Sequence, residues 1–253
     1  MVSKSVVPKV AGKMVAGVVA LGVAGGFLGG PEAQAHRRDF PFTYDWFQPA
    51  KGEKEIELHS RYRGRNNSFQ QQIEFEYGIT DRLMIAPYLV FEKELGGNLK
   101  YTEWKLESRY QLGEFQTGKV LPGVYLEYVG TKDGPDEVEG KLILSRYGKN
   151  GDNLSFNYII ERELEGGAEF ENVYSIGYAR SLGKKNTGFL GKRGARAGFE
   201  WIHNLSSGRI NAGPILGLSP AKNSWIVAGY AHNINDRGGN RPEFRLLFEY
   251  EWF

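Results

Sequence analysis

The chain of 253 residues has no cysteine, almost no net charge and only one long apolar run. The lack of cysteine excludes a disulfide scaffold and a cysteine-ligated zinc site. The formal charge of +2 is too small for the basic surface of a nucleic-acid-binding protein, so we expect no nucleic-acid partner. A polytopic helical membrane protein needs several apolar runs of about 20 residues, and only the N-terminus approaches that length.

Aromatic residues, by contrast, are abundant: 15 Phe, 14 Tyr and 5 Trp in a sequence that is hydrophilic on average. Hydrophobic residues at 41% and charged residues at 25% are close to the values of folded proteins, which argues against a disordered chain. The sequence therefore requires a fold that presents aromatic rings and charged groups in alternation.

The first 35 residues have the composition of a secretory signal peptide. Lys4, Lys9 and Lys13 form a basic leader, residues 14–28 an apolar run, and residues 33–35 (AQA) a cleavage site. We expect the mature chain to begin after residue 35. Because this segment holds three of the 32 basic residues and one of the 30 acidic residues, the mature chain is formally neutral.

Period-two alternation of apolar and polar residues fills most of the mature chain. We expect residues 36–52 to form an irregular periplasmic lead-in and residues 53–253 to form the folded domain. Segments of about ten residues follow one another there, separated by short turns rich in Gly, Asn and Asp. The alternation is clearest in residues 53–63, 68–80, 100–112 and 243–252. The pattern predicts an antiparallel meander of about 12 strands, within a range of roughly 10 to 14.

Two architectures can accommodate such a meander. A soluble β-sandwich would bury the aromatic face in a core, where the polar groups of many Tyr and Trp residues would need partners. A membrane barrel, with strands of about 9 to 11 residues, turns this face toward lipid and lets those groups reach water at the interface. We therefore predict an all-β fold, an antiparallel up-and-down transmembrane β-barrel with both termini in the periplasm and outer-membrane lipid around it. A secreted soluble β-sandwich is the alternative.

The C-terminal sequence RLLFEYEWF resembles the assembly signal of Gram-negative outer-membrane barrels. Phe248, Tyr250 and Trp252 alternate along it, and Phe253 follows one residue out of step. The resemblance implies that the barrel-assembly machinery is a partner and that the protein is located in the cell outer membrane.

Most of the mature chain resembles one broad family of small outer-membrane barrels, assigned as transporters in phenol-degradation clusters. The resemblance lies in the strand, tight turn and strand of residues 75–91 (FEYGITDRLMIAPYLVF) and in the Gly-Tyr pairs at 177–178 and 229–230. It implies a β-barrel with a transport function and leaves the solute unidentified.

In a membrane barrel, the charged face of each strand lines the lumen. Acidic residues outnumber basic residues on this face, so we expect an acidic interior, with the compensating lysines and arginines at the rims. The predicted lumen-lining residues are Glu55, Glu57, Arg61, Glu74, Glu76, Glu103, Lys105, Glu107, Arg109, Glu127, Lys141, Arg196, Glu200, Arg245, Glu249 and Glu251.

Twelve strands fall between small barrels filled by side chains and 16-stranded porins with an aqueous channel. We predict a narrow passive channel or transporter for small solutes, with a weak preference for cations. The alternative is a non-conducting structural or lipid-interacting barrel, in which the same charged residues form a closed network.

A less favoured third function is an outer-membrane lipid hydrolase. The sequence WIHNLSSGR resembles the phospholipase motif, in which His and Ser lie two residues apart, but the residue two places after His203 is Leu205. Ser206 and Ser207 are expected in a turn, away from the imidazole. We therefore predict no catalytic residues and no enzyme activity, and neither a metal site nor a cofactor, since no His pair has metal-ligand spacing.

Overall fold

The computed structural model describes residues 37–64, 67–94, 96–183, 190, 194–235, 237 and 242–252. The predicted signal peptide at residues 1–35 and the terminal Phe253 lie outside these ranges. The described part of the chain contains no helix with the length and apolar character that a membrane crossing requires.

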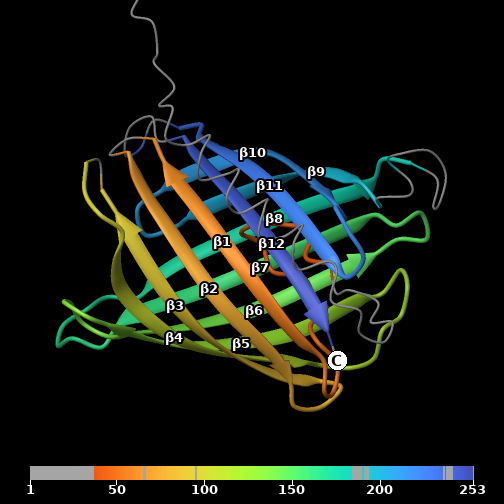
Figure 1. Ribbon diagram of the computed structural model, residues 1–253, viewed down its shortest axis with the longest axis horizontal. Helices are drawn as coiled ribbons and strands as arrows, with labels where there is room; N and C mark the ends of the chain where they lie inside the picture. Colours follow the sequence, from red (N-terminus) through yellow and green to blue (C-terminus); the bar gives the residue numbers. More distant parts are fainter. Residues whose placement is uncertain are drawn as a thin grey trace, which may run out of the picture.

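Twelve antiparallel strands form one closed barrel (Figure 1). Each strand pairs with its neighbours in the sequence, and β12 closes the barrel on β1. The all-β class and the twelve-stranded antiparallel barrel are thus confirmed, whereas the side that the termini face stays a prediction. The strands are β1 Lys54–Arg63, β2 Ser68–Gly78, β3 Leu83–Lys93, β4 Lys100–Gln111, β5 Val120–Thr131, β6 Glu137–Tyr147, β7 Asn153–Glu163, β8 Glu171–Ser181, β9 Arg196–Asn204, β10 Arg209–Leu218, β11 Ser224–Asn233 and β12 Glu243–Trp252.

The alternation in the sequence becomes an inner and an outer face in the structure. In β3, Met84, Ala86, Tyr88 and Val90 are buried, while Ile85 and Leu89 between them are exposed. Successive side chains of a strand point to opposite faces, so each strand contributes one row to the lumen and one to the outer surface.

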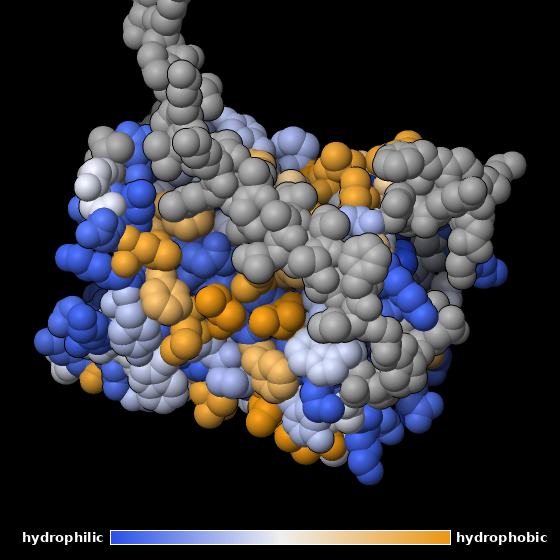
Figure 2. All heavy atoms as spheres, viewed as in Figure 1, coloured by the Kyte–Doolittle hydropathy of each residue, from blue (hydrophilic) through white to orange (hydrophobic). Residues whose placement is uncertain are grey.

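The barrel has the reverse sidedness of a soluble protein. Carboxylates such as Glu76 and Glu107 are fully buried, whereas Leu126 in β5 is 62% exposed. Figure 2 shows hydrophobic side chains grouped across the middle of the face in view, with hydrophilic side chains toward its ends. An exposed apolar band of this kind is the surface that a membrane barrel presents to lipid.

Residues 37–50, here called the lumenal segment, run inside the barrel and have no regular secondary structure. The backbone N–H of Thr43 donates to Glu200 of β9 at 2.7 Å, and that of Tyr44 donates to Asn157 of β7 at 2.6 Å. Trp225 of β11 donates its indole N–H to the carbonyl of Arg38 at 2.8 Å. The position of this segment within the lumen was not foreseen from the sequence.

Two strand glycines leave room for this segment. A Cβ atom on Gly177 of β8 would lie 2.7 Å from the Phe40 ring, and one on Gly229 of β11 would lie 2.6 Å from Pro41. Real side chains do not approach so closely, so a larger residue at either position would collide with the lumenal segment.

Candidate functional site

None of the predicted lumen-lining residues is exposed on the outer surface. Their burial shows that the charged face of the strands is the inner face, but whether they line a conducting path stays a prediction. Buried are Glu55, Glu57, Glu74, Glu76, Glu107, Arg109, Glu127, Glu200, Glu249 and Glu251. Partly buried are Arg61, Glu103, Lys105, Lys141, Arg196 and Arg245.

Arg109 of β4 is the centre of one buried charge cluster. Its guanidinium forms ion pairs with Glu76 of β2 and, at 2.7 Å, with Glu107 of β4. Tyr88 of β3 donates its hydroxyl to Glu107, and the carbonyl of Phe47 in the lumenal segment lies 3.4 Å from Arg109. The Arg109 guanidinium thus neutralises two carboxylates. Both carboxylates lie on the inner face because of the alternation of side chains along their strands.

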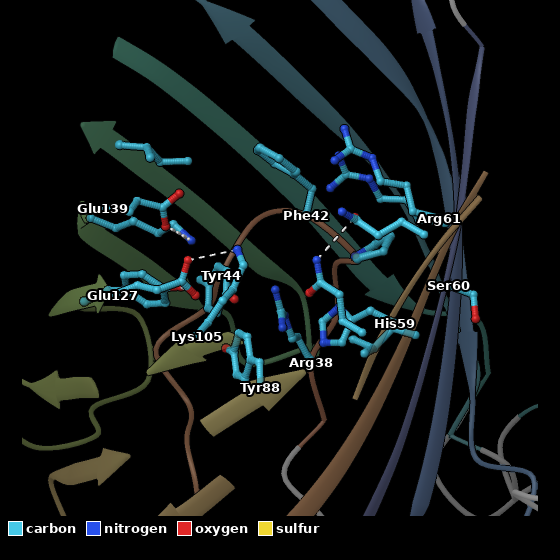
Figure 3. Close-up of a pocket in the computed structure, with 18 of the residues that line it drawn as sticks. Arg38, Phe42, Tyr44, His59, Ser60, Arg61, Tyr88, Lys105, Glu127 and Glu139 are labelled. Atoms are coloured by element: carbon cyan, nitrogen blue, oxygen red, sulfur yellow. Dashed lines mark hydrogen bonds and ion pairs between the residues drawn. The ribbon is translucent and has the colours of Figure 1, made fainter. Parts of the chain in front are cut away.

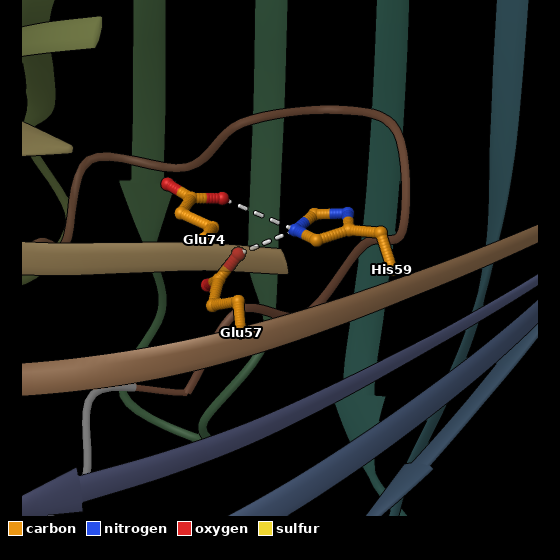
Figure 4. Close-up of side chains that lie close together, drawn as sticks. All are labelled: Glu57, His59 and Glu74. Atoms are coloured by element: carbon orange, nitrogen blue, oxygen red, sulfur yellow. Dashed lines mark hydrogen bonds and ion pairs between the residues drawn. The ribbon is translucent and has the colours of Figure 1, made fainter. Parts of the chain in front are cut away.

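Arg38 provides the second buried cation, and it comes from the lumenal segment. It pairs with Glu57 of β1 at 3.2 Å, and its guanidinium carbon lies 3.8 Å from the centre of the Tyr44 ring. His59 of β1 lies beside Glu57, with 2.6 Å between Nε2 and a carboxylate oxygen, and 3.3 Å from Glu74 of β2 (Figure 4).

Lysines pair with glutamates on β4, β5 and β6. Lys105 lies 3.0 Å from Glu127, and Lys141 lies 2.5 Å from Glu139. The Lys141 ammonium is also 3.8 Å from the centre of the Tyr125 ring, where the negative ring face stabilises a cation. Polar and aromatic groups therefore share this wall of the lumen.

On the opposite wall of the lumen, at β1 and β12, two arginines share one glutamate. Glu243 of β12 accepts from Arg61 of β1 at 2.7 Å and also pairs with Arg245. The guanidinium carbon of Arg245 stacks 4.3 Å from the Phe42 ring of the lumenal segment.

Two aspartates of the lumenal segment share one amide. Asn153 of β7 donates to Asp39 at 2.8 Å and to Asp45 at 3.2 Å, and Arg196 of β9 pairs with Asp39. Burial raises the pKa of the Asp39 carboxyl to about 6; Arg196 opposes this shift and Asp45 adds to it. Asp39 therefore takes up its proton at mildly acidic pH.

A cavity of about 210 Å³ remains in the lumen beside the lumenal segment (Figure 3). Residues of the lumenal segment, among them Arg38, Phe42 and Tyr44, line it on one side, and side chains of β1 to β7 and β12 line it from the barrel wall. We call this space the vestibule. It is lined by basic, acidic and aromatic groups together, so it suits a small polar solute better than an apolar one.

The sequence did not reveal that the lumenal segment belongs to the site. The available signal was its composition, because residues 40–47 hold five aromatic side chains in a stretch that forms no strand in the structure. Such a segment has rings to bury and no strand face to bury them on. Phe40 is fully buried in the structure, against Ala179, Ile215 and Trp225.

The residues of the hydrolase alternative have different partners. His203 Nδ1 lies 3.0 Å from the hydroxyl of Tyr174, while Ser206 accepts from the backbone N–H of Asn172 at 3.0 Å. Neither of these contacts joins the imidazole to the serine that it would have to activate.

Comparison with known proteins supports the fold and nothing finer. No protein-family model and no curated protein sequence matches the chain. Among solved structures, the KdgM porin in complex with disordered oligogalacturonate is 11% identical, with a TM-score of 0.54 over 78% of this chain and 98% of that one. The NanC porin is 10% identical, with a TM-score of 0.53 over 77% of this chain and 98% of that one.

An outer membrane channel from Pseudomonas putida F1 is similar in the same way. It is 10% identical, with a TM-score of 0.55 over 82% of this chain and 97% of that one. The chain therefore has the porin-like fold of outer-membrane β-barrels. Its relation to transporters of phenol-degradation clusters stays a prediction, because identities this low show the fold alone.

Proposed function

We propose that this protein is a narrow outer-membrane channel for small polar solutes. The observation that carries the proposal is the reversed sidedness of a closed twelve-stranded barrel, with buried charge inside and exposed apolar side chains outside. Charged groups that line a lumen keep water there, since a dry buried charge is costly. The vestibule provides space for this water.

The balance of buried charge supports a weak preference for cations. Among the described residues, only Arg38 and Arg109 are buried basic residues, whereas eleven Asp and Glu residues are buried. A lumen with an excess of negative groups lowers the energy of a cation within it and raises that of an anion.

The lumenal segment restricts the passage. It occupies the part of the lumen between Glu200, Asn157 and Trp225, and the vestibule is the space left beside it. Solute flow therefore depends on how firmly these contacts hold the segment in place.

The direct test is conductance in planar bilayers under a salt gradient. The wild type should give small unitary currents with a reversal potential of cation-selective sign. Gly177→Leu should raise the conductance, because the new side chain collides with Phe40 and displaces the lumenal segment.

A matched control is Gly140→Leu in β6, where a Cβ has its nearest neighbour at 4.0 Å and causes no collision. Its conductance should equal that of the wild type. Anion selectivity, or the same low current in Gly177→Leu as in the wild type although folding is verified by heat-modifiable migration, would contradict the proposal.

The second candidate is a non-conducting structural barrel in the outer membrane. The hydrogen bonds that fix the lumenal segment to β7, β9 and β11 favour it. It predicts a folded barrel without current in both the wild type and Gly177→Leu.

A further inference from the structure

Three potential metal-ligand side chains meet on the inner face of β1 and β2. Glu57 stands directly opposite Glu74 in the strand register, and His59 follows two residues later on the same face. One nitrogen of His59 and one oxygen of each glutamate lie within 4.8 Å of one another. Figure 4 shows both carboxylates directed at the same imidazole nitrogen.

The imidazole cannot satisfy both carboxylates. Its Nε2 carries at most one hydrogen, and Glu57 at 2.6 Å is better placed to accept it than Glu74 at 3.3 Å. Both oxygens of Glu74 are buried without a hydrogen-bond donor, and the side chain is 1% exposed. A buried carboxylate in this state is destabilising unless a cation or a proton joins it.

The neighbouring cations are already engaged by other acids. Arg109 pairs with Glu76 and Glu107, and Arg38 pairs with Glu57. His59 is therefore the one charged or chargeable donor that the described residues place against Glu74. This local shortage of positive charge is an observation independent of the three-ligand geometry.

We propose that Glu57, His59 and Glu74 form a binding site for a divalent transition-metal ion of the Zn²⁺ class. Imidazole nitrogen with carboxylate oxygen is a ligand set typical of Zn²⁺, which takes three protein ligands and leaves a position for water. His59 lines the vestibule, so an ion can reach the site from the lumen.

Arg38 and the ion share Glu57. One oxygen of Glu57 faces Arg38, and the other is buried without a hydrogen-bond donor, so the carboxylate can serve both. The guanidinium charge nevertheless opposes a second cation nearby. Ion binding is thereby linked to the lumenal segment that carries Arg38.

The test is isothermal titration calorimetry with Zn²⁺ on the untagged mature protein, folded in detergent. The wild type should bind one Zn²⁺ per barrel. His59→Gln and Glu74→Gln should each weaken binding by more than about tenfold, because each removes a ligand. Arg38→Gln should bind Zn²⁺ more tightly than the wild type, because it removes the opposing charge.

His203→Gln is the matched control, since His203 lies on β9 and contacts Tyr174 instead. It should bind Zn²⁺ as the wild type does. Co²⁺ offers a second readout, because its visible absorption reports the coordination of the bound ion, and this spectrum should change in His59→Gln.

No Zn²⁺ binding to the wild type, or equal binding by His59→Gln, would overturn the proposal. Weaker binding by Arg38→Gln would overturn it as well. These readouts measure binding rather than current, so their outcome is separate from that of the channel proposal.

Discussion

At the residue scale, the few buried arginines are expected to contribute strongly to the stability of the barrel. Arg109 is the shared cation of Glu76 and Glu107, and all three side chains are at most 3% exposed. Removing one partner of a buried ion pair leaves a charge that neither water nor protein stabilises. Surface pairs lack this effect because water replaces the lost partner.

Arg109→Met should therefore destabilise the barrel by about 3–5 kcal/mol at neutral pH. Arg82→Met is the comparison, because Arg82 pairs with Glu114 where both side chains are exposed, and its loss should change stability by about 0–1 kcal/mol. Urea unfolding in lipid vesicles measures both. Equal effects of the two substitutions would show that the Arg109 cluster is hydrated.

At the element scale, the proposed channel function depends on the lumenal segment, which has no regular secondary structure. Side-chain and backbone hydrogen bonds hold it to β7, β9 and β11. Strand glycines at 177 and 229 provide the space. Its contacts with the barrel wall include carboxyl groups, so its attachment should depend on pH.

The pKa of Asp39 determines the direction in which docking of the lumenal segment changes with pH. Its pKa in the docked segment is raised by burial from about 3.8 to about 6, so the docked state binds the proton more strongly than the free segment does. Docking is therefore favoured most below about pH 4, and this contribution is lost as the pH rises to about 6. Hydrogen exchange of residues 37–50, corrected for intrinsic rates, should show protection falling over this interval.

Asp39→Asn is the control, because the amide does not titrate. The difference in protection between wild type and variant should change between about pH 4 and 6 and stay constant above. A pH-independent difference would mean that Asp39 keeps one protonation state throughout the interval.

At the scale of the whole molecule, the outer surface separates a membrane barrel from a soluble one. Leu126 lies in β5 and is 62% exposed, whereas Leu164 lies in the turn after β7 and is 54% exposed. The two leucines have similar exposure but different positions along the strands. The environments of the two leucines differ strongly only if a bilayer surrounds the barrel.

Leu126→Arg should destabilise the protein in lipid vesicles by about 2–4 kcal/mol, the value for a charge on the lipid face near the bilayer midplane. Leu164→Arg, near the rim, should cost about 0–1 kcal/mol. Unfolding titrations in vesicles measure both. Equal effects would favour a soluble barrel, in which both leucines are ordinary surface residues.

The sequence by itself determined the faces of the strands and their approximate number. Alternation is a local property, since neighbouring side chains of a strand point to opposite sides whatever the rest of the chain does. Residues such as Glu57, Glu74 and Arg109 could thus be assigned to the inner face from their positions alone. The same local pattern predicted about twelve strands, because the turns interrupt it at regular intervals.

Only the tertiary structure decided which of these groups meet. Glu57 faces Glu74 because β1 and β2 pair in one particular register, and Arg38 reaches Glu57 because the lumenal segment folds back into the barrel. The lumenal segment forms no strand ladder, so no register fixes its partners in advance. Its place follows from the shape and charge of a lumen that exists only when β12 has closed on β1.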